Sequence, residues 1–178
     1  MPSLRLHPDS RCSAVTHIEV NIARPRADDL TLSYILVGKI EDVRILPVAK
    51  PKRIDELWLH TCFEAFIRSA SGAEYYEFNF APSTEWAAYR FDSYRTGRRV
   101  AEEITTVRIE TQSGRDRYTL KASLELDRLS GFSPDVVWHL GLSAVIEDVS
   151  GAKSYWALSH PSGKPDFHCA DCFAHELA

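Results

Sequence analysis

The chain has 178 residues, with 21 Lys and Arg against 25 Asp and Glu and a formal net charge of -4. A chain of this length forms one domain, residues 1–178, that is large enough to bury its own core without metals or disulfides. The weakly acidic charge argues against a nucleic acid or an anionic membrane as partner, because both favour a dense positive patch.

The first residues, MPSLRLHPDSRC, lack the charged and then apolar pattern of a signal peptide. The longer apolar runs are interrupted well before the roughly 18 residues that a transmembrane helix needs. We therefore expect a cytoplasmic protein without a membrane partner. In a reducing compartment its four cysteines are expected to be thiols.

Apolar residues recur with a period of two, which predicts short strands and almost no helix. In chain order, the expected strands are residues 17–23, 30–37, 56–68, 74–80, 86–91, 104–110, 118–126, 136–147, 154–158 and 173–177. Segments rich in Gly, Pro or charge separate them, and one helical turn is expected near 127–130. This spacing predicts an all-β fold, an antiparallel β-sandwich of jelly-roll type.

The stretch DELWLHTCFEAFIRSASGAEYYEFN predicts a hairpin of two strands, 56–68 and 74–80. One face of this hairpin belongs to the core, and the second face is unusually rich in aromatic, acidic and other polar side chains. That face would carry Trp58, His60, Glu64, Tyr75, Glu77 and Asn79. Aromatic rings and carboxylates side by side suit a polar ligand with apolar faces, such as a sugar. The alternative is plain packing, in which Trp58 covers the sheet edge and Glu64 pairs with Arg90 or Arg68.

A second informative run, SYWALSHPSGKPDFHCADC, contains Trp156, His160, Asp166 and His168 in a proline-stiffened segment. We expect this segment to fold over the sheet, so that Trp156 forms an aromatic wall opposite Trp58. Its Cys-x-x-Cys pair has zinc-ligand spacing. A second close pair is missing from the sequence, so thiols without a metal are expected here, although a site at these cysteines stays an alternative.

The segments DELWLHTCFEAFI, YYEFNFAPSTEWAAYRFDSYR, LGLSAVIED and SYWALSHPSGKPDFH, spread over about 55–168, resemble the bacterial DOMON-like domains. These are related to haem- and sugar-binding DOMON domains and to family 9 carbohydrate-binding modules. The resemblance implies a β-sandwich with a ligand site on one face. In the sugar-binding modules two tryptophans clamp the sugar beside a carboxylate, and Trp58, Glu64 and Trp156 match that arrangement.

The haem-binding relatives commonly use methionine and histidine as iron ligands. The single methionine of this chain is Met1, so a methionine–histidine site is excluded. A bis-histidine site formed by His60 with His160 or His168 remains an alternative.

We therefore expect a module that binds a small polar ligand, most plausibly a saccharide, without a cofactor. The expected ligand-binding residues are Trp58, His60, Glu64, Tyr75, Glu77, Asn79, Arg90, Trp156, His160, Asp166 and His168. The sequence lacks a nucleophile motif, a phosphate loop and a dinucleotide fingerprint, which favours binding over catalysis. The remaining alternatives are a haem carrier, a small hydrolase or isomerase, and a protein-interaction module.

Overall fold

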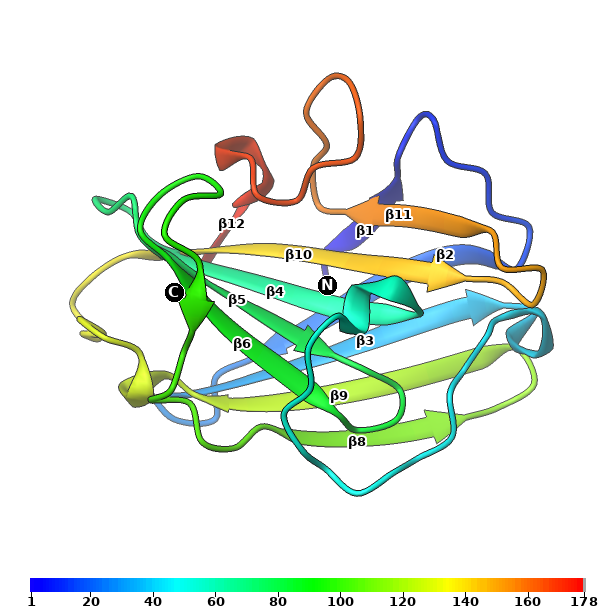
Figure 1. Ribbon diagram of the computed structural model, residues 1–178, viewed down its shortest axis with the longest axis horizontal. Helices are drawn as coiled ribbons and strands as arrows, with labels where there is room; N and C mark the ends of the chain where they lie inside the picture. Colours follow the sequence, from blue (N-terminus) through cyan, green and yellow to red (C-terminus); the bar gives the residue numbers. More distant parts are fainter. Residues whose placement is uncertain (178) are drawn as a thin grey trace.

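Two antiparallel β-sheets make up the architecture of residues 1–177, which the computed structural model describes (Figure 1). The last residue of the predicted domain, Ala178, lies outside this range. The described strands are β1 (Ser3–Leu6), β2 (Val15–Ala23), β3 (Asp29–Gly38), β4 (Cys62–Ser69), β5 (Tyr75–Phe80), β6 (Trp86–Phe91), β7 (Arg99–Val100), β8 (Arg108–Ser113), β9 (Arg117–Glu125), β10 (Trp138–Glu147), β11 (Lys153–Ala157) and β12 (His175–Leu177). The predicted all-β antiparallel sandwich is therefore confirmed.

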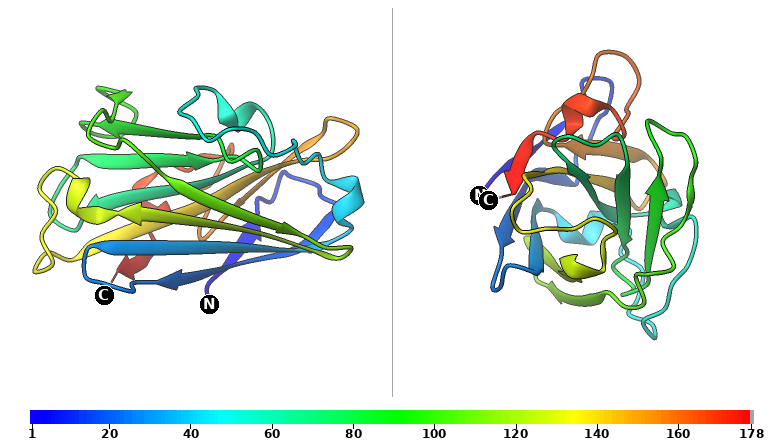
Figure 2. Two further views of the ribbon diagram at one scale, coloured as in Figure 1. Left: turned by 90° about the horizontal axis from the view of Figure 1, so that it is seen from below. Right: turned by 90° about the vertical axis from the view of Figure 1, so that its left-hand side faces the viewer.

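The strand β1 joins the two sheets, because it pairs with β2 on one side and with β11 on the other. Sheet A continues in the order β2, β3, β9 and β8, and sheet B in the order β11, β10, β4, β5, β6 and β7, with β12 also paired to β10. The end-on view in Figure 2 shows the two sheets curling toward each other around the core.

The core between the sheets follows from strict alternation along the strands. In β9 the buried residues Tyr118, Leu120 and Leu124 alternate with more exposed polar ones, as predicted from the sequence. Tyr34 of β3 reaches across this core, where its hydroxyl donates to the Glu64 backbone carbonyl at 2.7 Å. Its ring packs on Phe63 with centroids 5.1 Å apart, so one side chain ties sheet A to sheet B.

Sheet B is buried on both of its faces. The face toward sheet A contributes to the main core, whereas the outer face carries a second apolar cluster. This outer cluster consists of Phe66, Tyr75, Ala87, Tyr89, Phe91 and Phe173. Loops cover the outer face, which explains why β4 and β5 are apolar on both sides and confirms that the second face does not simply lie open to water.

The expected strand 56–68 is too long at its start. The structure places a 3-10 turn, η2 (Leu57–Leu59), before β4, and Glu56 adopts a left-handed conformation with φ of 63°. This turn breaks the alternation, so Leu59 is 45% exposed instead of lying in the core. From Cys62 onward the predicted phase is correct, with Phe63 facing sheet A.

Three further short turns are η1 (Ile40–Asp42), η3 (Leu126–Arg128) and η4 (Ala170–Cys172). The turn η3 confirms the helical turn expected near 127–130. Strands β1 and β7 were not predicted, and β8 begins at Arg108 rather than at residue 104. Within residues 1–177, no helix combines the length and apolar character needed to cross a membrane.

Candidate ligand-binding site

A cavity of about 480 Å³ lies on the outer face of sheet B. Its floor comes from β4, β5, β10 and β11, and its walls come from η2 and from the loops that follow β6 and β11. Figure 1 shows both loops rising on the same side of sheet B. The expected site on this second face of the hairpin therefore corresponds to a real hollow in the molecule.

Two buried carboxyl groups form the polar floor of the cavity. Glu64 of β4 is 4% exposed and Glu77 of β5 is 6% exposed. The strand register sets Glu64 opposite Asn79 and Glu77 opposite Phe66, so the two carboxyls are diagonal neighbours on one face. Glu64 accepts a hydrogen bond from Ser143 Oγ at 3.1 Å, and Glu77 accepts one from Asn79 Nδ2 at 3.0 Å.

Burial dominates the protonation of these carboxyls. Burial, followed by the negative charge of Glu77, raises the pKa of Glu64 from 4.5 to about 8. Burial also raises the pKa of Glu77, although the Asn79 hydrogen bond and two nearby arginines favour its ionised form. Near pH 7 the floor therefore presents a protonated Glu64, which can donate or accept, beside Glu77 as an acceptor.

Asn79 supports this description of the floor. Its Oδ1 is buried and has no hydrogen-bond partner among the described residues. Residues directly opposite each other in an antiparallel pair have Cβ atoms about 4.5–5.5 Å apart. A protonated Glu64, which stands directly opposite, is thus a neighbouring group able to donate to this amide oxygen.

His168 lies on the wall above Glu77, and its tautomer follows from its partners. The Arg95 backbone N–H donates to the Tyr75 hydroxyl at 3.1 Å, so that hydroxyl donates its own proton to His168 Nδ1 at 2.8 Å. The ring proton is then on Nε2, which lies 3.8 Å from Glu77 Oε2. Burial, and next the positive charge of Arg95, lower the pKa of His168 to about 4, so the imidazole is neutral at pH 7.

Aromatic side chains stand on two sides of the cavity. On the β6 side, the indole of Trp58 lies edge-on to Tyr89 with centroids 6.1 Å apart. On the β11 side, Tyr155 and Phe167 line the cavity with their centroids 6.2 Å apart. The site therefore has apolar walls over a polar floor, as expected from the residue types.

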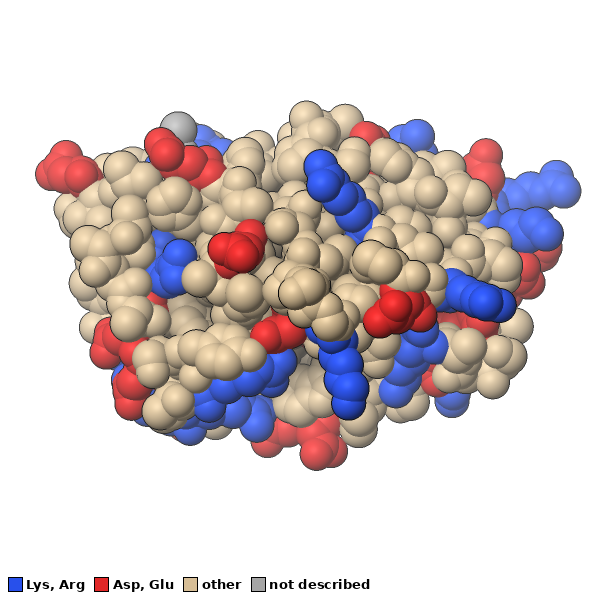
Figure 3. Space-filling model, turned by 90° about the horizontal axis from the view of Figure 1, so that it is seen from above, with Lys and Arg blue, Asp and Glu red and all other residues tan. Residues whose placement is uncertain are grey.

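Basic residues lie around the mouth. Arg95 and Arg98 come from the loop after β6, and Lys153 comes from the start of β11. Arg95 is neutralised by Asp166, whose Oδ1 lies 2.8 Å from its guanidinium. Figure 3 shows basic and acidic side chains interspersed on the face seen from above.

The expected pair of facing tryptophans is wrong. Trp156 is 5% exposed and belongs to the main core, and its Nε1 donates to Ser154 Oγ at 3.0 Å. It is paired in register with Ala144, which also faces the core. Because side chains alternate along a strand, the preceding residue, Tyr155, faces the cavity in its place.

Two of the expected histidines lie outside the cavity. His60 follows the η2 turn, and its Nδ1 lies 2.7 Å from Glu147 Oε2, a carboxylate that also pairs with Arg44. His160 Nε2 hydrogen-bonds the Arg5 carbonyl at 2.7 Å. His168 alone of the three expected histidines lines the cavity. The two histidines of either expected bis-histidine pair therefore do not line one cavity together.

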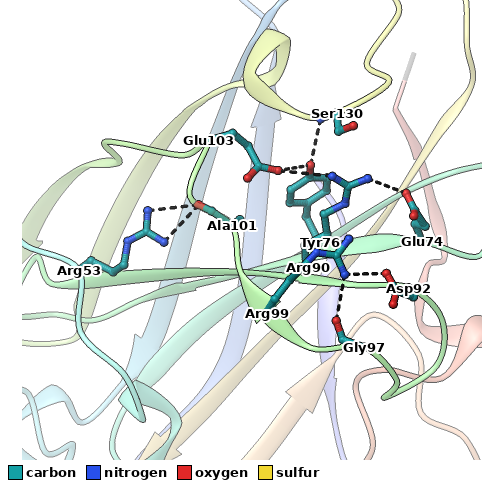
Figure 4. A network of polar contacts seen from close by, with 10 residues as sticks. All are labelled: Arg53, Glu74, Tyr76, Arg90, Asp92, Gly97, Arg99, Ala101, Glu103 and Ser130. Carbon is teal, nitrogen blue, oxygen red and sulfur yellow. Dashed lines mark hydrogen bonds and ion pairs between the residues drawn. The ribbon is translucent and has the colours of Figure 1, made fainter.

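Arg90 belongs to a separate network of polar contacts (Figure 4). It lies beside Tyr76 of the main core, on the face of sheet B opposite the cavity. It pairs with Glu74 at 2.8 Å and lies near Glu103 at 3.8 Å, with its guanidinium over the Tyr76 ring. It is consecutive with Tyr89, which faces the other way. The expected role of Arg90 in ligand binding is not supported by this position.

Tyr75, Asn79 and Asp166 support the cavity from behind its surface. Tyr75 orients His168, and Asn79 holds Glu77, as described above. Asp166 accepts hydrogen bonds from the Tyr94 hydroxyl, the Arg95 guanidinium and the His168 backbone N–H. It therefore joins the loop after β6 to the loop after β11.

The cysteines do not assemble with other ligands. All four are free, and the single S–H of the buried Cys172 lies within hydrogen-bonding distance of the carbonyls of Ser159 and Asp166. Within residues 1–177, no three His, Cys, Asp or Glu side chains are grouped as a metal site would require.

The sequence did not reveal the basic mouth or the wall residues Tyr155 and Phe167. By composition the loop DSYRTGRR indicates only a connection between strands, although its arginines beside a glycine are a signal for a basic, tightly turned segment. Gly97 adopts φ of +68°, and a Cβ there would collide with Asp92, so glycine is required in this turn.

No protein-family model matches the sequence, and no curated protein matches it. Among solved structures, the chain is similar to a Bacteroides uniformis protein for which carbohydrate binding has been suggested. The TM-score is 0.65 at 16% identity, covering 88% of this chain and 76% of that one.

It is also similar to a family 9 carbohydrate-binding module of Caldicellulosiruptor kristjanssonii solved with glucose and with cellotriose. The two structures give TM-scores of 0.46 and 0.43, each at 14% identity and 82% coverage of this chain, and cover 76% and 75% of that chain. With the Bacteroides uniformis protein, the chain shares an antiparallel β-sandwich fold.

Proposed function

We propose that this chain is a saccharide-binding module of DOMON-like type, with its site in the cavity on the outer face of sheet B. The observation that carries the proposal is the combination of the Trp58 indole at one wall with the Glu64 and Glu77 carboxyls at the floor. A volume of about 480 Å³ also falls within the range of about 300–1,000 Å³ that is usual for small-molecule sites.

The chemistry of the lining suits a sugar ring. The C–H face of the ring would stack on the Trp58 indole, which buries apolar surface on both partners. Its hydroxyls would donate to the Glu77 carboxylate and accept from His168 Nε2–H, while the protonated Glu64 could serve in either direction. The suggested carbohydrate binding of the Bacteroides uniformis protein supports the same class of ligand.

Calorimetric titration of the purified protein with a panel of monosaccharides and disaccharides tests the proposal. Replacing the stacking ring, Trp58→Ala, should weaken binding by about 1–3 kcal/mol, which corresponds to roughly fivefold to 150-fold in affinity. Arg90→Gln is the matched control, because Arg90 lies on the opposite face of sheet B. Unchanged affinity in Trp58→Ala, or an equal loss in Arg90→Gln, would contradict the assigned site.

Catalysis is a second candidate, favoured by the two neighbouring buried carboxyls, Glu64 and Glu77, both with raised pKa values. A general acid and a neighbouring carboxylate are the groups used to cleave glycosidic bonds. Turnover of a glycoside that disappears in Glu64→Gln, with ligand binding and folding retained, would support an enzyme. Binding without turnover would support the module.

A further inference from the structure

The cavity separates its charges, with carboxyls at the floor and cations at the mouth. Arg95 has Asp166 as its ion-pair partner. Arg98 and Lys153 line the cavity without an ion pair to any described residue. The mouth therefore carries two cationic side chains, Arg98 and Lys153, that form no direct ion pair within residues 1–177, although the charge of Arg98 also acts on Glu77 at the floor.

Neighbouring aromatic rings hold the exposed side chain of Arg98 in place at the mouth of the cavity. Its guanidinium lies over the Tyr89 ring at 4.1 Å and near the Trp58 ring at 5.2 Å. The Gly97 turn precedes it, and the Arg99–Asp92 ion pair of 2.6 Å follows it (Figure 4). A guanidinium has five N–H donors, so Arg98 can contact Tyr89 and still offer N–H groups to a carboxylate or phosphate.

We propose that the preferred saccharide carries an anionic group, a carboxylate or a phosphate, and that Arg98 binds this group. This inference rests on the proposed function, because it takes the cavity as the saccharide site. A sugar stacked on Trp58 brings its substituents next to Arg98, since both side chains line the same wall. Lys153 lies on the β11 side of the cavity, away from the wall formed by Trp58 and Arg98, and adds to the positive potential at the mouth.

Pairs of sugars that differ in one acidic group test the inference. The probes are glucose with glucuronate, galactose with galacturonate, glucuronamide as the uncharged counterpart, and glucose 6-phosphate. Calorimetry at low salt should give at least tenfold tighter binding for an acidic member than for its neutral counterpart. The advantage should shrink in about 0.5 M NaCl, because the cations at the mouth are open to solvent.

The variant Arg98→Gln should remove this advantage, so that the acidic and neutral members of each pair bind with equal affinity. Lys153→Gln should reduce the advantage by a smaller factor, and Trp58→Ala should weaken neutral and acidic sugars alike. Arg98 is exposed, so its replacement should leave the fold intact, which circular dichroism and thermal melting can check.

The two proposals fail in different ways. Equal binding of acidic and neutral sugars, or an acidic preference that survives Arg98→Gln, would overturn the inference and leave the saccharide site standing. Inorganic phosphate or acetate that binds as tightly as the acidic sugars would also overturn it, because the sugar ring would then contribute nothing. Absence of binding by every sugar in the panel would overturn the proposed function and this inference together.

Discussion

The two faces of strand β4 are equally buried but differ in what they contain. Toward sheet A the strand presents Phe63, Ala65 and Ile67, which pack into the main core. Toward the cavity it presents Glu64 and Phe66. A buried carboxyl is costly to desolvate and unnecessary for packing. The inner face of β4 therefore contributes mainly to stability, whereas the outer face includes a destabilising carboxyl that forms the polar floor of the cavity.

Replacing the two tryptophans that were expected to face each other should have different consequences for stability and for binding. The loss of stability on replacing Trp156 should be the largest of the effects predicted here. Trp156→Ala should reduce the free energy of unfolding by about 3–5 kcal/mol, the usual cost of removing a large core side chain. Trp58 is half-buried at the cavity wall, so Trp58→Ala should cost less stability while weakening ligand binding. Denaturant titration and calorimetry on both variants measure the contrast. Loss of ligand binding in a Trp156→Phe variant that keeps its fold and stability would contradict the assignment of Trp156 to the core rather than to the site.

Alternation along strands is the reason that the floor of the site could be predicted. Glu64 and Glu77 follow from the phase of apolar residues in β4 and β5, which the structure confirms. In the segment SYWALS the same rule gives no answer, because Tyr155 and Trp156 are both large and aromatic. The phase is decided by the pairing of Trp156 with Ala144 on β10, a contact that is distant in sequence.

The buried Glu64 should make stability depend on pH in the direction opposite to a usual paired carboxylate. Its pKa rises from 4.5 to about 8 in the folded protein, so the native state binds one more proton than the unfolded chain between these values. Stability therefore falls as pH rises through this window, by up to about 1.4 kcal/mol per unit. His168 acts in the other direction, because its pKa falls from 6.5 to about 4, so its contribution increases from pH 4 to 6.5.

Between pH 5 and 6.5 the contributions of Glu64 and His168 therefore oppose each other, and from pH 6.5 to 8 the Glu64 contribution remains, so the wild type should lose stability there. Glu64→Gln removes the carboxyl, so its stability relative to the wild type should increase by up to about 4 kcal/mol between pH 5 and 8. Urea titrations across this range provide the measurement, and the difference between the two proteins cancels the titrating groups that do not interact with Glu64. Glu77 does not cancel, because its negative charge contributes to the raised pKa of Glu64. A difference that is constant with pH would show that Glu64 has an ordinary pKa when folded.

The mouth of the cavity could not be predicted in the same way, because loops carry no periodicity. Arg95 and Arg98 reach the cavity through a loop that turns at Gly97, and the location of Arg95 also depends on its ion pair with Asp166 in a different loop. For His60, the position predicted from alternation is wrong. A left-handed Glu56 and a 3-10 turn move His60 away from the face that unbroken alternation would give it, and neither feature is visible in the pattern of apolar residues.

Two consecutive tyrosines, Tyr75 and Tyr76, test the difference between the two faces of sheet B directly, and their replacement should change stability and affinity least. Tyr75 faces the cavity and hydrogen-bonds His168, while Tyr76 faces the other way and donates to Glu103 at 2.5 Å. Each hydroxyl also accepts a backbone N–H, from Arg95 and Ser130 respectively. Replacing either tyrosine by phenylalanine should therefore cost a similar amount of stability, on the order of 1 kcal/mol.

The difference should appear at the ligand site. Tyr75→Phe removes the donor that fixes the His168 tautomer, so His168 should show altered ring signals by NMR and saccharide affinity should fall severalfold. Tyr76→Phe should leave both unchanged, because its partners belong to the network around Arg90 on the inner face (Figure 4). Equal effects of the two variants on binding would mean that affinity follows general stability rather than the orientation of His168. A change confined to Tyr75→Phe would instead assign the hydroxyl a positioning role, because the two replacements remove the same atom and the same number of hydrogen bonds.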